Sequence, residues 1–119
     1  MKANYYDLEK RMLHFGADVV RHCAKLKQPV LRSITDQLIR SSTSVGANYT
    51  EANNASSKAD FRNKVFIAKK EASESRYWLQ LLAELGDITE ERQKIEQECQ
   101  ELVMILQKIV NTLAKKSEK

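Results

Sequence analysis

The 119-residue sequence contains few of the residues that bend or end secondary structure, since it has only three glycines and one proline. Aromatic residues make up 7% of the chain. β-Sheet proteins need many turn residues and runs of β-branched or aromatic side chains, so this composition disfavours an all-β fold. It favours a few long helices with short connections, in one domain over residues 1–119.

The sequence also lacks long hydrophobic runs. No apolar stretch approaches the roughly 20 residues that a helix needs to cross a bilayer. The first residues, Met-Lys-Ala-Asn-Tyr-Tyr-Asp, do not include the apolar segment of a signal peptide. We therefore expect a cytoplasmic protein that has no membrane partner.

Cysteine and histidine are too few and too widely spaced to indicate a cofactor. Cys23 and Cys99 are not part of a Cys-x-x-Cys motif, so we expect reduced, buried thiols, with a disulfide as the alternative. His14 and His22 do not have the spacing of metal-ligand pairs. The sequence has neither a Gly-x-Ser-x-Gly motif nor a glycine-rich phosphate loop. We expect no metal, no cofactor, no catalytic residue and no enzymatic activity.

Four segments place apolar side chains at spacings of three and four residues, the pattern of helices that bury one face. They predict helices over about residues 5–27, 33–55, 58–85 and 89–115. Pro29 is expected to end the first helix and Gly86 the third. Two serines, each three residues before an aspartate, are expected to cap the second and third helices: Ser33 and Ser57. The predicted fold is all-α, an up-down-up-down antiparallel four-helix bundle with left-handed, shallow crossings.

Residues 38–52 differ from the other buried faces, because small or polar side chains occupy most of the expected face. A polar residue such as Asn48 at a buried position can fix helix register, and it then needs hydrogen-bond partners. We favour such a packing role over direct ligand contact. Glu51 either pairs with a basic residue of another helix or subunit or is exposed and unpaired. The residues of this packing and register motif are Ser41, Ser44, Val45, Asn48, Glu51 and Ala52.

The net charge of +4 is distributed unevenly along the chain. Residues 1–86 hold 14 Lys and Arg against 9 Asp and Glu, whereas residues 87–119 hold 6 against 7. The acids of the second part cluster between Asp87 and Glu101, at the start of the fourth helix. A basic surface attracts nucleic acid through its phosphates, but a surplus this mild is also typical of an ordinary solvated surface.

A basic stripe follows the third helix, where Arg62, Lys69 and Arg76 recur every seven residues. The stripe is either a solvated face whose charges pair at (i, i+4), as Lys70 and Glu74 would, or a surface that binds phosphates. The first helix has a similar, interrupted stripe. The candidate nucleic-acid-binding residues on these two helices are Arg11, Lys25, Lys58, Arg62, Lys69, Lys70 and Arg76.

The first and third helices carry more apolar surface than one bundle needs. Each helix either uses a wide face to contact two neighbours or contributes to an interface between copies of the chain, since large apolar patches are uncommon on monomers. The candidate oligomer-interface residues are Tyr6, Leu13, Val20, Ile67, Trp78 and Leu81.

The second helix also contains a family signature. Ser44, Val45, Asn48 and Glu51 match a pattern of a Ser, an aliphatic residue, and an Asn that is followed three residues later by Glu. In this respect the chain resembles the small four-helix-bundle proteins encoded within bacterial 23S rRNA intervening sequences. The third helix fits as well, through residues that include Phe61, Ala68, Ala72, Ser73, Glu74 and Leu79. The resemblance covers about residues 5–115.

The resemblance implies a closed four-helix protomer and a pentameric ring. It also suggests kinship with the accessory proteins of diversity-generating retroelements, which are basic pentamers that bind nucleic acid and a reverse transcriptase. We therefore expect a non-enzymatic homo-oligomer, a pentamer, that binds nucleic acid, as rRNA or another RNA, through the basic faces of its first and third helices. The alternative is a protein-interaction scaffold that binds a protein partner and no nucleic acid. The acidic start of the fourth helix and the extra apolar surface motivate that alternative.

Overall fold

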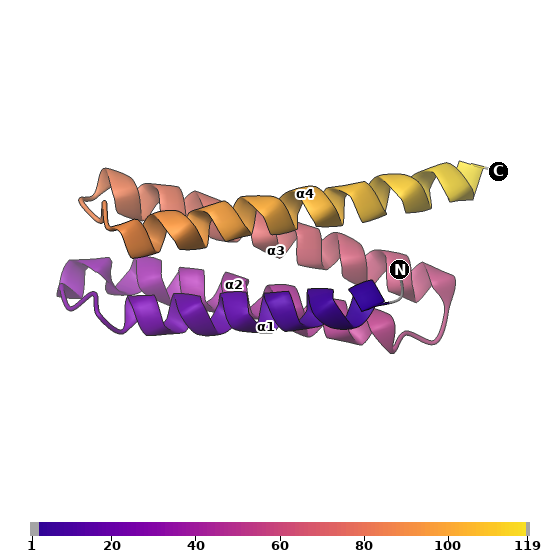
Figure 1. Cartoon of the computed structure of the whole chain (residues 1–119), viewed down its shortest axis with the longest axis horizontal. Helices are drawn as coiled ribbons and strands as arrows, with labels where there is room; N and C mark the ends of the chain where they lie inside the picture. Colours follow the sequence, from indigo (N-terminus) through magenta and orange to yellow (C-terminus); the bar gives the residue numbers. More distant parts are fainter. Residues whose placement is uncertain (1–2, 119) are drawn as a thin grey trace.

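The computed structural model describes residues 3–118, with the side chains of residues 7–115. This part of the chain contains no strand, and its elements are α1 (Ala3–Cys23), η1 (Pro29–Leu31), α2 (Arg32–Asn53), α3 (Lys58–Glu84) and α4 (Glu90–Glu118). The chain reverses direction at each connection, and the helices form an elongated bundle of 50 × 24 × 21 Å (Figure 1). The predicted all-α four-helix bundle is confirmed.

The start of the second helix differs from the prediction. α1 ends at Cys23, four residues before the expected end, in turns where the Lys25 and Leu26 N–H groups donate to carbonyls three residues back. Pro29 then begins the 3₁₀ turn η1, which leads directly into α2. Leu31 therefore precedes α2 without a side-chain cap, and Ser33 lies inside the first helical turn. The expected cap at Ser33 is wrong for this reason.

The two ends of α3 follow the prediction. Oγ of Ser57 accepts a hydrogen bond from the Asp60 N–H at 3.0 Å, which caps the first turn. After Glu84 the chain turns at Gly86, whose φ of 109° is a conformation that favours glycine. The Asp87 N–H then donates to the Leu82 carbonyl at 2.9 Å and closes the end of the helix.

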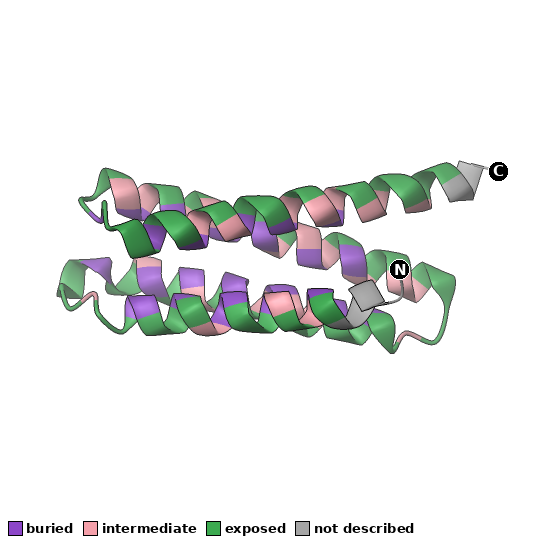
Figure 2. Cartoon of the chain, viewed as in Figure 1, coloured by how far each residue is buried: buried purple, intermediate pink, exposed green. Residues whose placement is uncertain are grey.

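One core runs along the axis of the bundle, and the buried parts of the helices face inward (Figure 2). The largest fully buried side chains include Tyr49, Phe15, Met12, Leu38 and Leu79. α2 and α3 share the most extensive contact among the helix pairs of the described chain, whereas α1 and α4 share the sparsest. None of the helices in this part of the chain is long and apolar enough to span a bilayer.

The buried face of α2 includes most of the face expected from its sequence, with Leu38, Ser41, Val45 and Ala52 buried, but it is broader than expected. Tyr49 is fully buried, whereas Asn48 and Ile34 are only half-buried. α2 packs against both α1 and α3, so its buried face is broader than a single stripe and includes Tyr49. Within residues 38–52, where small or polar side chains were expected at most buried positions, Tyr49 thus adds a large side chain to the core.

Candidate nucleic-acid interface

Basic residues of α1 face the acidic start of α4. Arg11 donates two hydrogen bonds to Glu98, of 3.0 and 2.7 Å, and a third to Glu101 at 2.9 Å. Hydrogen bonding to Glu98 is the main cause of a raised pKa for Arg11. Lys25 pairs with Glu91 at 3.0 Å. Arg11 and Lys25 are therefore engaged inside the protomer, so a nucleic acid would have to compete with these ion pairs to bind either residue.

His22 joins the same two helices at the end of the bundle. Its ring is 3% exposed, with Nε2 2.6 Å from Asp87 and Nδ1 2.5 Å from Glu91. An ionised carboxylate only accepts hydrogen bonds, so both contacts are satisfied when both ring nitrogens carry a proton. Burial opposes ionisation of Asp87, but hydrogen bonds from His22 and Thr89 outweigh it, and the pKa of Asp87 is lowered. Hydrogen bonds from His22 and Lys25 also lower the pKa of Glu91.

This cluster is a link between helices. Among the residues with described side chains, no group of three His, Cys, Asp or Glu side chains is arranged to hold a metal ion. Both nitrogens of His22 already have a carboxylate partner. The acids at the start of α4, which motivated the protein-scaffold alternative, are thus partly used within the protomer.

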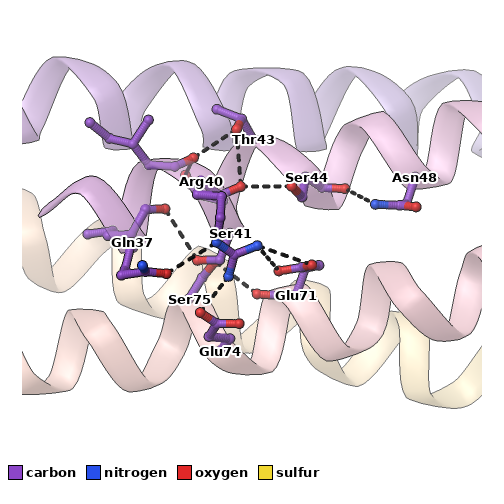
Figure 3. A network of polar contacts seen from close by, with 12 residues as sticks. Gln37, Arg40, Ser41, Thr43, Ser44, Asn48, Glu71, Glu74 and Ser75 are labelled. Carbon is purple, nitrogen blue, oxygen red and sulfur yellow. Dashed lines mark hydrogen bonds and ion pairs between the residues drawn. The ribbon is translucent and has the colours of Figure 1, made fainter. Parts of the chain in front are cut away.

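A second polar network connects α2 to α3 (Figure 3). The Arg40 guanidinium pairs with Glu71 at 3.2 Å and with Glu74 at 2.5 Å. Glu74 also accepts a hydrogen bond from Nε1 of Trp78 at 2.9 Å. Arg40 first, and then Trp78, lower the pKa of Glu74. Below this exposed network, the hydroxyls of Ser41 and Ser75 lie 2.8 Å apart in the core.

The packing and register motif lies along the contact between α2 and α3. Ser41, Val45 and Ala52 are buried. The three remaining members are polar and have partners within the protomer. Ser44 donates to the Arg40 carbonyl at 2.8 Å, and Asn48 donates to the Ser44 carbonyl at 2.8 Å (Figure 3). Glu51 pairs with Lys64 at 2.8 Å. Small side chains allow the two helix backbones to approach, so these positions take part in packing inside one chain.

The basic stripe of α3 has a different environment from that of α1. Arg40 and Trp78 engage Glu74, so Glu74 does not neutralise Lys70 as an (i, i+4) partner. Within the described side chains, Lys69 and Lys70 contact the ring of Phe66, each with its Nζ 6.0 Å from the ring centre. Lys58 and Arg62 are exposed, and Arg76 is half-buried with an Nε that has no hydrogen-bond partner in the described chain. We call these five residues the α3 basic face: Lys58, Arg62, Lys69, Lys70 and Arg76.

Two aromatic residues beside this face were not identified from the sequence. Phe66 is 45% exposed and Tyr77 is 58% exposed. A signal for both was present, because neither falls on the three- and four-residue spacing of the buried face of α3. An aromatic residue outside the core stripe of a long helix is a candidate contact residue.

The candidate oligomer-interface residues lie on two different helices. Leu13 and Val20 of α1 are 68% and 40% exposed. Ile67 and Leu81 of α3 are half-buried, and Trp78 packs partly against the core of its own protomer. The side chain of Tyr6 lies outside the described residues.

Comparisons with known proteins give a consistent result. A crystal structure of a protein of unknown function from the S23 ribosomal protein family of Bacteroides thetaiotaomicron is similar to this chain, with 36% sequence identity and a TM-score of 0.77. The match covers 87% of this chain and 97% of the other. None of the curated proteins matches. The model of the 23S rRNA-intervening sequence protein family matches residues 6–108, so the chain belongs to this family.

Proposed function

We propose that this protein is a non-enzymatic homo-oligomer, a pentamer, that acts in the cytoplasm and binds RNA through the α3 basic face. One observation supports this choice of face over α1. Arg40 of α2 engages Glu71 and Glu74, the carboxylates that follow Lys69 and Lys70 in sequence. Arg11 and Lys25 of α1, by contrast, have acidic partners of their own. Within residues 7–115, whose side chains are described, Lys69 and Lys70 have no ion pair that a nucleic acid would have to break, and both contact the ring of Phe66.

The arrangement suits a polyanion. Lysine and arginine side chains spread along a helix neutralise successive phosphates of the nucleic acid. Release of the counterions bound to these phosphates provides a favourable, salt-dependent free energy. In a ring, each protomer adds a copy of the face, and a long RNA that contacts several copies gains affinity through the high effective concentration of the next site. A weak site on one protomer is thus sufficient for useful binding.

The test of the RNA proposal is a titration of labelled rRNA fragments, followed by fluorescence anisotropy at several salt concentrations. We expect affinity to fall as salt rises. The double variant Lys69→Glu with Lys70→Glu should bind more weakly, and its slope of log affinity against log salt concentration should be less steep by about 0.7 for each lost phosphate contact. The matched control is Lys94→Glu with Lys108→Glu, which makes the same charge change at exposed positions of α4. No binding at low salt, or equal losses in both double variants, would contradict the proposal.

The oligomer proposal is supported by exposed apolar side chains on α1. Leu13 is 68% exposed in the protomer, and packing against another copy of the chain would remove this apolar surface from water. Light scattering coupled to size exclusion measures the mass directly. We expect a pentamer, and we expect Leu13→Glu to yield smaller species, whereas Met104→Glu, at another position that is 58% exposed, leaves the mass unchanged. A monomeric wild-type protein would rule out this part of the proposal.

A protein-interaction scaffold is the second candidate, and the end of the bundle supports it. The α1–α2 and α3–α4 connections lie at the same end (Figure 1). This end exposes 78% of Val30, 52% of Leu85 and 74% of Ile88, and such apolar groups suit a protein partner. Pull-down after nuclease treatment distinguishes the candidates. Recovery of one protein by the wild type, and not by Val30→Glu with Ile88→Glu, would favour the scaffold.

A further inference from the structure

Two exposed aromatic rings follow one line of α3 among basic residues. Phe66, Lys70, Ser73 and Tyr77 are spaced by four, three and four residues, so they share one side of the helix. At 1.5 Å per residue, the two aromatic positions lie about 16 Å apart along the axis. Between these positions lie the exposed residues Lys70 and Ser73, the second with a small side chain. We call these four residues the aromatic track.

Positive charge flanks the first ring of the track. The Nζ atoms of Lys69 and Lys70 each lie 6.0 Å from the centre of the Phe66 ring, a cation–π distance. Both ammonium groups lie over the ring, so a planar group that stacks on it would take the place of at least one of them, and the displaced lysine would then be available to pair with a phosphate. A nucleotide has the matching chemistry, with a flat base and an anionic phosphate one sugar away.

Neighbouring contacts hold the second ring. The rings of Tyr77 and Trp78 meet edge to face, with centres 5.1 Å apart and an interplanar angle of 73°. Trp78 is anchored through Nε1 to Glu74, which Arg40 holds from α2. A ring that is positioned in the free protein loses less conformational entropy when a ligand stacks on it.

Acidic residues mark the far end of the track. Tyr77 lines a shallow hollow together with Glu84 of α3 and Glu96 of α4. Glu96 is paired with Arg92, but Glu84 is exposed. Carboxylates repel phosphates, so a polyanion bound to α3 is directed from Tyr77 toward the start of the helix, where Lys69 and Lys70 lie.

We propose that Phe66 and Tyr77 stack unpaired bases, and that the α3 basic face therefore takes single-stranded nucleic acid in preference to a closed duplex. The inference rests on the proposed nucleic-acid function and specifies its ligand. Phosphates are present in both forms, so the lysines alone do not distinguish them. Base faces are available only in a single strand, because in a duplex they are covered by their neighbours in the stack.

The test compares one RNA oligonucleotide, without self-complementarity, with the duplex formed by the same strand and its complement. The variants are Phe66→Ala and Tyr77→Ala, with Phe66→Trp and Tyr77→Phe as conservative controls. We expect the wild type to prefer the single strand, and each alanine variant to lose about tenfold in affinity for it, the scale of one lost stacking contact. Duplex affinity should stay unchanged, which also shows that the variants are folded. The conservative variants should bind the single strand as the wild type does.

The outcomes separate the two levels of the proposal. Equal affinity for both forms, with no effect of the alanine variants and a clear loss in Lys69→Glu with Lys70→Glu, overturns the stacking inference and leaves the basic face intact. No binding of either form overturns both. The remaining alternative is that the two rings pack against a second copy of the chain, and light scattering on each alanine variant tests it by measuring the mass. A change in mass without selective loss of single-strand affinity would assign the rings to the oligomer interface and overturn the inference.

Discussion

Nε2 of His22 lies 2.6 Å from Oδ2 of Asp87, and this contact joins the last turn of α1 to the connection between α3 and α4. Both side chains are almost fully buried, at 3% and 5% exposure. α1 and α4 share the sparsest contact in the described bundle, so polar links have a larger part in holding these helices together. Removal of one partner leaves the other buried group without its hydrogen bond, which costs more than the intact contact contributes.

A double-mutant cycle should show this coupling. We expect His22→Ala and Asp87→Ala each to lower the free energy of unfolding by about 3 kcal/mol, and the double variant to be little worse than either single one. Urea unfolding followed by circular dichroism measures the free energy of unfolding of the wild type, the two single variants and the double variant. The control is Asp18→Ala, which breaks an exposed pair with Arg21 and should cost about 0.5 kcal/mol or less. Additive losses at His22 and Asp87 would show that they are not coupled.

Stability should fall in acid through Asp87 and Glu91. The folded protein lowers the pKa of both carboxyls, so the unfolded chain binds protons at higher pH than the folded chain does. Their contribution is therefore fully present above the unfolded values near pH 4, and it is lost as pH falls through the lower, folded values. Urea midpoints measured across this range should decline less steeply in Asp87→Asn than in the wild type. An unchanged slope would contradict the assignment.

The two helical glycines at the contact between α1 and α2 should respond differently to alanine. A Cβ at Gly46 would lie 3.3 Å from Cβ of Met12, so one helix must shift, whereas at Gly16 the nearest atoms are at an ordinary 3.6 Å. Alanine favours helix over glycine by about 1 kcal/mol. We expect Gly16→Ala to raise the thermal midpoint and Gly46→Ala to lose most or all of that gain to overpacking. Equal stabilisation at both sites would show that the contact at Gly46 is easily relaxed.

Both thiols should be protected in the folded protein. Burial is the main cause that raises the pKa of Cys23 to about 11 and that of Cys99 to about 12. The Cys99 thiol also donates to the Ala72 carbonyl at 3.2 Å. A thiol reagent at mildly alkaline pH should label neither cysteine in buffer and both in denaturing urea, because the thiolate is the reactive form. Rapid labelling of Cys99 without denaturant would contradict the buried placement.

Features governed by local physics could be predicted from the sequence. The amphipathic spacing identified four helices, and Ser57 and Gly86 identified both ends of α3, because capping and turn conformations depend on a few adjacent residues. The same reasoning failed at Ser33, where the preceding 3₁₀ turn moves the start of α2 to Arg32. A local signal predicts well only where no neighbouring element competes for the same residues.

The candidate site could be predicted only in part. The α3 stripe was visible as a seven-residue repeat, but the sequence did not distinguish its environment from that of Arg11 and Lys25. The same difficulty applies to Tyr49, which lies next to the predicted stripe and is buried because α2 contacts two neighbours. Each of these outcomes depends on which helices are adjacent and on how each is rotated about its axis.

The sequence by itself determined the helix count, the approximate helix lengths, the apolar faces and the family signature. These properties follow from the period of the α-helix and from residue preferences within one or two turns. Only the tertiary structure decided which charges meet. It paired Arg11 with Glu98 and Arg40 with Glu74, and it thereby left Lys70 without its expected partner. Ion pairs act over a few ångströms between helices that are far apart in sequence, so packing must bring them together before their partners are defined.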